Sequence, residues 1–284
     1  MSVATDLFRR WNLVADIIRL AIASGRVNNI AHRVNLVLVS QPGKGKTTGI
    51  LRGMGLPGVA VATDISPRGV DLLLQRAKAG WLSTVLIPDF GSIINRKYET
   101  ARQTVSMIAT ACAEGVYDVM VAGRQREFDG TGFNIITAIT ADDLVEGFNV
   151  LTRNGFTTRV ILVDMDLDLA ELQAMWERKH IKGDRRLLSP LSFKGFYANG
   201  KAPLRSIKVS VTYYQQVLDW WKLMADKAPE FMYGFRTPDM LIGMLQASAY
   251  LRGSWRVTRA DVKVVERLQT LWIKQVKVQK RQGT

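Results

Sequence analysis

The chain has 284 residues, of which 47% are hydrophobic, and its 39 Lys and Arg against 25 Asp and Glu give a formal net charge of +14. The hydrophobic content excludes disorder on a large scale, and the charge favours a polyanionic partner. The single cysteine, Cys112, cannot form an internal disulfide. With no signal peptide and no apolar stretch long enough to span a bilayer, we expect a cytoplasmic protein without a membrane partner.

Apolar periodicity predicts an N-terminal helix followed by alternating strands and helices. Residues 4–24 place apolar side chains at helical spacing, which describes one amphipathic helix. Five apolar and β-branched runs then predict strands: VNLVLVS from residue 34, GVAVATD from 58, STVLIPD from 83, FNIITAIT from 133 and TRVILVDMD from 158. Nearly continuous runs of this kind are typical of parallel strands covered on both faces, so we expect an α/β fold with a parallel five-stranded sheet.

The strand signal fades after residue 167, and the rest of the chain predicts a smaller all-helical domain. Helices are expected over residues 168–180, 213–227, 236–252 and 258–280. The predicted organisation is an N-terminal helix over 1–30, an α/β core over 31–167 and a helical domain over 168–284 with a basic insertion at 183–207 and a basic C-terminal tail.

The stretch SQPGKGKTT, residues 40–48, stands between a predicted strand and the helical segment TTGILRG. This context is the one that a phosphate-binding loop requires. We expect Lys46 to reach the β- and γ-phosphates of ATP, and Thr47 to offer its hydroxyl to Mg²⁺. Ser40 replaces the usual first glycine, at a position that mainly turns the chain out of the sheet. The predicted nucleotide-binding residues are Gly43, Lys44, Gly45, Lys46, Thr47 and Thr48.

A second chemical signal is TVLIPDF, where an apolar strand ends at Asp89. A carboxylate at that point can hold the water shell of Mg²⁺, so we expect the metal near Thr47 and Asp89. Another acidic group, Asp164, Asp166 and Asp168, follows the last predicted strand. Because it leads into a helix, we interpret it as helix capping.

The order of PGKGKTT, LIPDF, a polar residue ending IITAIT, FTTRVILVD and a helical C-terminal part resembles the AAA+ ATPases. The resemblance implies that Thr140 is the sensor 1 residue that orients the attacking water. It implies that Arg159 is the arginine finger that reaches a neighbouring subunit's nucleotide, with Arg153 as the alternative finger. The run GFRTPDMLIGMLQ looks like the MCM-helicase lid, which makes Arg236 the sensor 2 residue, expected beside Lys46 of its own subunit.

The stretch EGVYDVMVAGRQREFDGTG predicts a β-hairpin with its turn at Ala122-Gly123. It resembles the pre-sensor-1 hairpin of the superclade that includes MCM helicases, magnesium chelatases and enhancer-binding activators. In ring helicases this hairpin touches the DNA backbone, so Arg124 and Arg126 near the tip are candidate phosphate contacts. Three more candidates share a helical face in the C-terminal tail: Lys274, Lys277 and Arg281.

The sequence departs from the family in one respect, because PDF offers one carboxylate where AAA+ proteins have Asp-Glu. Either Asp89 serves the metal and the catalytic base is elsewhere, or Asp89 is itself the base. We expect an AAA+ ATPase that assembles as a homo-oligomer, a hexameric ring or a helical filament, on DNA and acts as a helicase, translocase or loader, in a phage or mobile element. The alternatives are a protein-remodelling ATPase and a slow or non-hydrolysing ATP-dependent DNA-binding switch.

Overall fold

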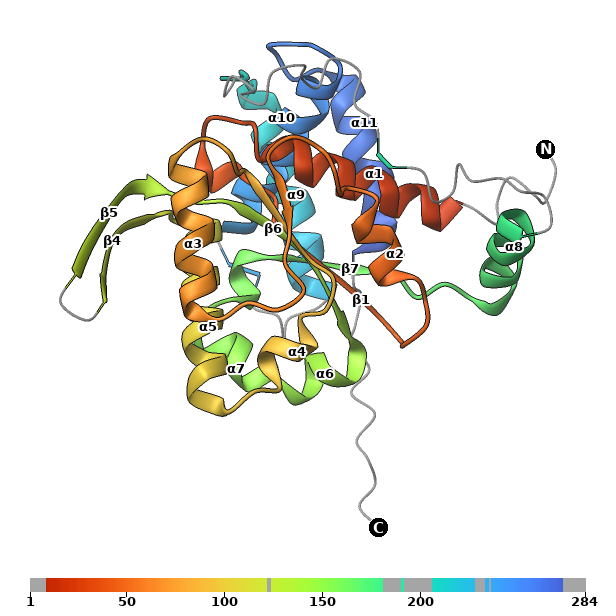
Figure 1. Cartoon of the computed structure of the whole chain (residues 1–284). Coiled ribbons are helices and arrows are strands. Elements are labelled where there is room, and N and C mark those ends of the chain that lie inside the picture. The colour runs from red at the N-terminus through yellow and green to blue at the C-terminus, as the bar shows by residue number, and fades with distance from the viewer. Residues whose placement is uncertain are drawn as a thin grey trace, which may run out of the picture.

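The computed structural model describes residues 9–121, 124–180, 190–191, 206–227, 233–234 and 236–272. Its centre is a five-stranded sheet in the order β2-β3-β6-β1-β7 (Figure 1), and every strand pairing within it is parallel. The strands are β1 Leu36–Ser40, β2 Val59–Val61, β3 Thr84–Ile87, β6 Asn134–Thr140 and β7 Ile161–Asp164. Each lies inside a predicted run, so the predicted α/β fold with a parallel five-stranded sheet is confirmed.

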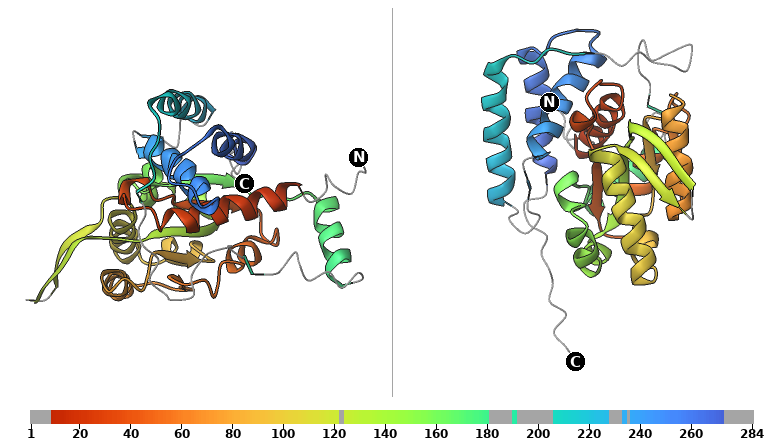
Figure 2. Two further views of the ribbon diagram at one scale, coloured as in Figure 1. Left: turned by 90° about the horizontal axis from the view of Figure 1, so that it is seen from above. Right: turned by 90° about the vertical axis from the view of Figure 1, so that its left-hand side faces the viewer.

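Helices cover both faces of this sheet, which is why β1 and β3 are buried along their whole length. Two helices, α1 Arg9–Ser24 and α2 Lys46–Leu51, lie directly on one side of the strands, and a second set lies on the opposite side (Figures 1 and 2). That second set is α3 Pro67–Lys78, α4 Gly91–Ile94, α5 Tyr98–Ala113, α6 Ala141–Glu146 and α7 Phe148–Arg153. Two short 3₁₀ turns, η2 Ile30–His32 and η3 Thr157–Arg159, complete the core.

The apolar face of α1 is buried between the sheet and the C-terminal helix α10, Arg236–Leu251 (Figure 2). Helix α10 approaches the η2 turn so closely that a side chain on Gly243 would collide with the carbonyl oxygen of His32. The N-terminal helix therefore joins the α/β core to the helical C-terminal part. Among the described residues, no helix combines the length and the apolarity needed to cross a bilayer.

The other C-terminal helices are α8 Leu169–His180, α9 Val211–Lys227 and α11 Arg259–Leu268. The predicted helix over 258–280 is wrong in length, because α11 stops at Leu268 and gives way to the turn η6 Gln269–Leu271. The chain bends there so that Trp272, 5% exposed, can form a β-bridge with Val163 of β7. Burial of this large aromatic side chain outweighs the continuing helical periodicity.

The predicted hairpin is confirmed as the antiparallel pair β4 Val116–Val121 and β5 Arg124–Thr131, which projects from the body of the molecule (Figure 1). The predicted turn at Ala122-Gly123 lies outside the described residues. At the base of the hairpin the backbones approach closely, because a Cβ atom on Gly115 would lie 2.2 Å from the carbonyl oxygen of Gly130. Both glycines have positive φ angles, which residues with a side chain rarely adopt, and at Gly115 the packing excludes a side chain as well.

Candidate functional site

The strand order makes the carboxyl ends of β1 and β6 the switch point of the sheet. The chain leaves β1 toward β2 on one side of the sheet, whereas it leaves β6 toward β7 on the other. In open α/β sheets, ligands bind at the carboxyl edge where the loops of adjacent strands diverge in this way. Ser40 and Thr140 pair at the ends of the two strands, so the fold brings the loop over 40–48 next to Thr140.

The loop turns sharply through two glycines with left-handed backbone conformations. Gly43 has a φ of 77° and Gly45 a φ of 84°, values that a residue with a side chain rarely adopts. The ring of Trp11 packs beneath the loop, 3.6 Å from the position of a Cβ atom on Gly45. Trp11 is 2% exposed, so the apolar face of α1 supports the loop directly.

Lys46 follows these glycines, and its ammonium group folds back over the loop. Its Nζ donates to the carbonyl oxygens of Ser40 at 2.8 Å and Gln41 at 2.9 Å, and to the Ser40 hydroxyl at 3.1 Å. The serine that replaces the first glycine thus adds an acceptor for Lys46, and its small side chain is accommodated at the end of β1. These bonds hold the lysine charge over the mouth of the loop.

The electrostatic surroundings of Lys46 are acidic. Partial burial lowers the pKa of its ammonium, whereas the carboxylates of Asp166, Asp143 and Asp89 raise it. These carboxylates come from the segments that follow β7, β6 and β3. Burial has the larger effect, but carboxylates from three strand ends still act on this one lysine, and such oxygens can also hold a cation next to phosphates.

Asp143 is the site residue that the sequence analysis missed. A Cβ atom placed on Gly91 would lie 2.7 Å from Asp143 Oδ2 and 3.2 Å from Asp89 Oδ1, so the two carboxylates flank the same glycine. Thr140 donates its hydroxyl to Asp143 Oδ2 at 2.6 Å, and Asn95 donates its amide to Asp143 Oδ1 at 2.8 Å. The signal for this residue was an acid at the third position after the last residue of β6, typical of a helix N-terminus.

Thr140 also caps α6, since its Oγ1 accepts the backbone N–H of Asp143 at 3.0 Å. Its only hydroxyl proton points to the Asp143 carboxylate. In this structure Thr140 therefore positions a carboxylate and has one remaining lone pair toward other ligands. Its predicted role in orienting the attacking water stays a prediction.

Thr47 and Asp89 provide the oxygen atoms that a magnesium site at the loop would use. Both residues are exposed on the carboxyl edge, and hydroxyl and carboxylate oxygens suit Mg²⁺, which keeps several water ligands. In the described ranges no three acidic, histidine or cysteine side chains gather into a metal cage. The donors present thus fit an ion held together with phosphate and water.

The loop is also anchored to the segment after β7. Lys44 donates to the carbonyl oxygen of Leu167 at 2.5 Å. Just beyond it, Asp168 accepts a 2.7 Å bond from the backbone N–H of Glu171, which confirms its predicted capping role. The guanidinium of Arg52 lies 5.8 Å from the centre of the Trp11 ring. Packing of Trp11 and these polar contacts hold the loop between α1 and β7.

Arg159 and Arg236 lie together at the opposite, amino edge of the sheet. Glu114 Oε1 accepts hydrogen bonds from Arg159 at 2.6 Å and from Arg236 at 2.5 Å. The bond from Arg159, followed by that from Arg236, outweighs partial burial and lowers the pKa of Glu114. The expectation that Arg236 accompanies Lys46 in one chain is therefore wrong for this structure, because α10 begins beside the amino ends of the strands.

A pocket of about 370 Å³ opens beside this arginine pair. Its lining includes Arg159, Arg236 and the Glu114 that joins them. It also includes Arg33, Asn35 and Cys112. Asn35 donates to the carbonyl oxygens of both Cys112 and Arg159, which holds the ends of α5 and η3 together. The alternative finger, Arg153, lies elsewhere, at the end of α7 beside a second pocket of about 560 Å³.

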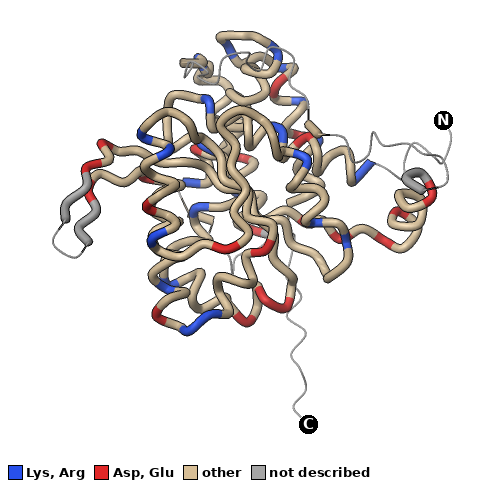
Figure 3. Tube along the Cα trace, in the orientation of Figure 1, with Lys and Arg blue, Asp and Glu red and all other residues tan. Residues whose placement is uncertain are grey.

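The proposed nucleic-acid contacts fall largely outside the described part of the chain. The backbone of Arg124 and Arg126 opens β5, but their side chains lie outside the described residues, as do Lys274, Lys277 and Arg281. Figure 3 shows basic and acidic residues interspersed over the described helices. At the base of the hairpin, Lys78 lies 3.1 Å from Asp129, which ties α3 to β5.

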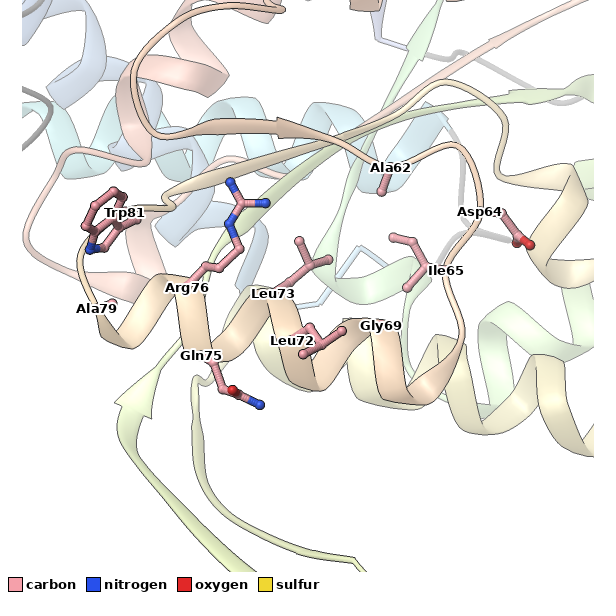
Figure 4. A pocket seen from close by; sticks show the side chains of 10 residues that line it. All are labelled: Ala62, Asp64, Ile65, Gly69, Leu72, Leu73, Gln75, Arg76, Ala79 and Trp81. Carbon is pink, nitrogen blue, oxygen red and sulfur yellow. The ribbon is translucent and has the colours of Figure 1, made fainter.

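A groove of about 660 Å³ runs along α3, beside the edge strand β2 (Figure 4). Apolar side chains dominate its lining, including Leu72 and Trp81, which are 54% and 70% exposed. Two strands separate β2 from β1, and the groove includes no residue of the loop over 40–48. It is therefore a feature distinct from the carboxyl-edge site.

Comparison with known proteins finds no family model that matches this chain and no curated protein with significant similarity to it. Function is therefore inferred from the residues and their geometry.

Proposed function

We propose that this chain binds ATP with Mg²⁺ at the loop over 40–48 and hydrolyses it. The observation that carries the proposal is the Lys46 ammonium, folded over a turn of two left-handed glycines at the switch point between β1 and β6. Phosphate oxygens would replace the carbonyl oxygens of Ser40 and Gln41 as the acceptors of Lys46. A strand-loop-helix context with this lysine is the arrangement that cradles phosphates in nucleotide-binding proteins.

The residues around Lys46 support hydrolysis as well as binding. Thr47 and Asp89 would hold Mg²⁺, which neutralises charge on the β- and γ-phosphates when bound. Lys46 would hold the same phosphates from the loop side and fix the γ-phosphorus at the switch point. Catalysis of phosphoryl transfer consists mainly of such positioning and charge stabilisation, so the carboxyl edge contributes most of the chemistry.

The arginine pair supports a homo-oligomer, because Arg159 and Arg236 lie at the opposite edge from Lys46 of the same chain. We assign them to the nucleotide of a neighbouring copy, where they would exchange the Glu114 carboxylate for phosphate oxygens. Contact between the amino edge of one copy and the carboxyl edge of the next is a head-to-tail interface. Repetition of that interface gives a ring if it closes, or a filament, as expected for an AAA+ ATPase.

DNA is the polyanion that we assign to this ATPase, in a helicase, translocase or loader role. The net charge of +14 supports a nucleic-acid partner, and the projecting hairpin supplies an arm that a strand of DNA could contact. Phosphate contacts of this kind are independent of sequence.

The first test measures binding of a fluorescent ATP analogue and phosphate release for the wild type, Lys46→Ala and Lys78→Ala. Lys78 is a matched control, since it is a lysine of α3 at the base of the hairpin. We expect Lys46→Ala to lose binding and turnover, and Lys78→Ala to keep both. Wild-type protein that binds no ATP would refute the proposal. Binding without phosphate release would leave the ATP-dependent assembly switch as the better account.

The DNA assignment is tested by repeating phosphate release with single-stranded and duplex DNA. The double variant Arg124→Glu, Arg126→Glu should lose stimulation by DNA and keep its basal turnover. Arg102→Glu, at an exposed arginine of α5, provides a charge-reversal control away from the hairpin. Equal stimulation in the hairpin variant and the control would favour a protein-remodelling ATPase over a DNA motor.

A further inference from the structure

We propose that Asp143 is the catalytic carboxylate that accepts the proton of the attacking water, which leaves Asp89 to serve the metal. This inference rests on the proposed ATP hydrolysis and names a residue for its chemical step. It follows from the juxtaposition of two carboxylates around Gly91, one after β3 and one after β6. The sequence PDF supplies a single acid, and the fold supplies the second from another strand.

The position of Asp143 is suited to the γ-phosphate side of the site. It follows β6, which pairs directly with β1, and Ser40 at the start of the loop pairs with Thr140 only three residues before Asp143. Its negative charge acts on the Lys46 ammonium, as does that of Asp89. A phosphate group held by Lys46 would therefore lie close to both carboxylates.

The orientation of Asp143 is fixed by hydrogen bonds to both of its oxygens. Thr140 donates to Oδ2 and Asn95 to Oδ1, and each oxygen retains a lone pair that can accept a further proton. A carboxylate held in one orientation pays little reorganisation when it receives a proton from water. Asp142, the preceding residue, is exposed, and the bonds from Thr140 and Asn95 go to Asp143 and not to it, so of these two adjacent acids Asp143 is the one held in place.

Asp89 differs in the way that its role requires. It follows β3 directly, it is exposed, and its Oδ1 accepts a long 3.4 Å bond from the backbone of Ser92. Such a carboxylate is free to turn toward a metal ion with its water shell. Two acids with different constraints thus divide the two tasks, which is the first of the two alternatives that the sequence leaves open for Asp89.

The chemical step balances with these groups. The water oxygen forms a bond to the γ-phosphorus as the bond from that phosphorus to the β,γ-bridging oxygen breaks, and its electron pair leaves on ADP. One water proton passes to an oxygen of Asp143, and the other remains on the product phosphate. Asp143 returns its proton to solvent after phosphate leaves.

The test compares Asp143→Asn with Asp142→Asn in the full chain. Asn keeps the size of Asp143 and one acceptor, whereas it cannot take the proton. We expect Asp143→Asn to bind the fluorescent ATP analogue within about 3-fold of wild type, and to release phosphate at least about 100-fold more slowly, the usual loss for a general base. Asp142→Asn should match wild type in both measurements.

Two further readouts separate catalysis from a structural role. After incubation with radiolabelled ATP, Asp143→Asn should retain intact ATP, where wild type retains ADP, and its thermal midpoint should stay near that of wild type. Asn95→Ala, which removes one orienting donor, should slow turnover about 10-fold without loss of binding, as expected for a misplaced catalytic group.

Each remaining outcome counts against the assignment. Turnover of Asp143→Asn within a few-fold of wild type would overturn it and leave the proposed ATPase function intact. Loss of ATP binding together with a lower thermal midpoint would show that Asp143 only holds the structure. Wild-type protein that binds ATP without hydrolysing it would overturn the proposed hydrolysis and this inference together.

Discussion

The two edges of the central sheet are electrostatic opposites. At the carboxyl edge, one ammonium, that of Lys46, feels the carboxylates of three strand ends. At the amino edge, one carboxylate, that of Glu114, receives the guanidinium groups of Arg159 and Arg236. The first edge has the loop and the acids that the proposed ATP hydrolysis would use, and the second has the arginines. If the proposed function holds, the separation of these groups in one chain teaches that a complete catalytic site would need edges from two copies of the chain.

The two edges are also built by different parts of the sequence. The carboxyl edge depends on local turns and on Trp11 beneath them. The amino edge depends on contacts between the core and α10, which brings Arg236 to Glu114. Changes in the C-terminal helices should therefore affect the arginine pair before they affect the loop.

The largest expected effect is on turnover and comes from Arg159→Ala at the amino edge. Removal of an arginine finger costs about 10³-fold or more in rate. ATP binding at the carboxyl edge should persist, since Lys46 and its loop are unchanged. Measurement of phosphate release and analogue binding checks this result, with Arg153→Ala as the control. Loss of turnover in Arg153→Ala alone would identify the alternative finger instead.

The next effect is on stability and comes from Trp11→Ala beneath the loop. Truncation of a fully buried Trp costs about 3 to 5 kcal/mol, because it removes apolar contacts and leaves a cavity. We expect a lower free energy of unfolding in urea and weaker ATP binding. Trp81→Ala, at the exposed groove, should change neither by much. Unaltered ATP binding in a folded Trp11→Ala protein would show that the loop over 40–48 keeps its conformation without support from Trp11.

Glu114→Gln should have a smaller effect that depends on pH. The pKa of Glu114 is lower in the folded chain than its ordinary value, so the ionised carboxylate stabilises the fold above about pH 4.5. That stabilisation is lost as pH falls through the lowered folded pKa. The pair is partly exposed, so the loss at pH 7 should be about 1 kcal/mol or less. Thermal unfolding of wild type and Glu114→Gln from pH 7 downward checks this. A difference in stability between the two proteins that is as large at pH 3 as at pH 7 would contradict it.

The smallest effect concerns Cys112, which lies behind the arginine pair. Burial raises the pKa of its thiol to about 12, so almost no thiolate forms in the native protein near pH 8. We expect a thiol reagent to label Cys112 only in urea. Rapid labelling of the native protein would show that the amino edge opens in solution.

The sequence predicted the strands and the hairpin well because their signals are local. Continuous apolar runs predict buried parallel strands, and the alternating pattern before and after Ala122-Gly123 predicts the hairpin. The end of α11 could not be predicted in this way, because it depends on the contact of Trp272 with Val163, a residue far away in the chain.

The loop with Lys46 and the acid at Asp89 could be predicted from the sequence, because each forms a motif next to a strand. Asp143 could not be predicted as a site residue, because it comes close to Asp89 only when β6 pairs with β3. Arg236 was assigned to the wrong edge, since the order of parts along a chain does not say which end of the sheet a helical domain covers. Glu114, which joins the two arginines, has no sequence signal of its own.

The central claim is tested most directly by mixing two inactive variants, Lys46→Ala and Arg159→Ala. Each carries a different tag, so that capture of one with the other demonstrates mixed assemblies. Lys46→Ala keeps the arginine pair, and Arg159→Ala keeps the ATP-binding edge, so we expect phosphate release to reappear in the mixture. Mixed assemblies that stay inactive would contradict a site shared between copies.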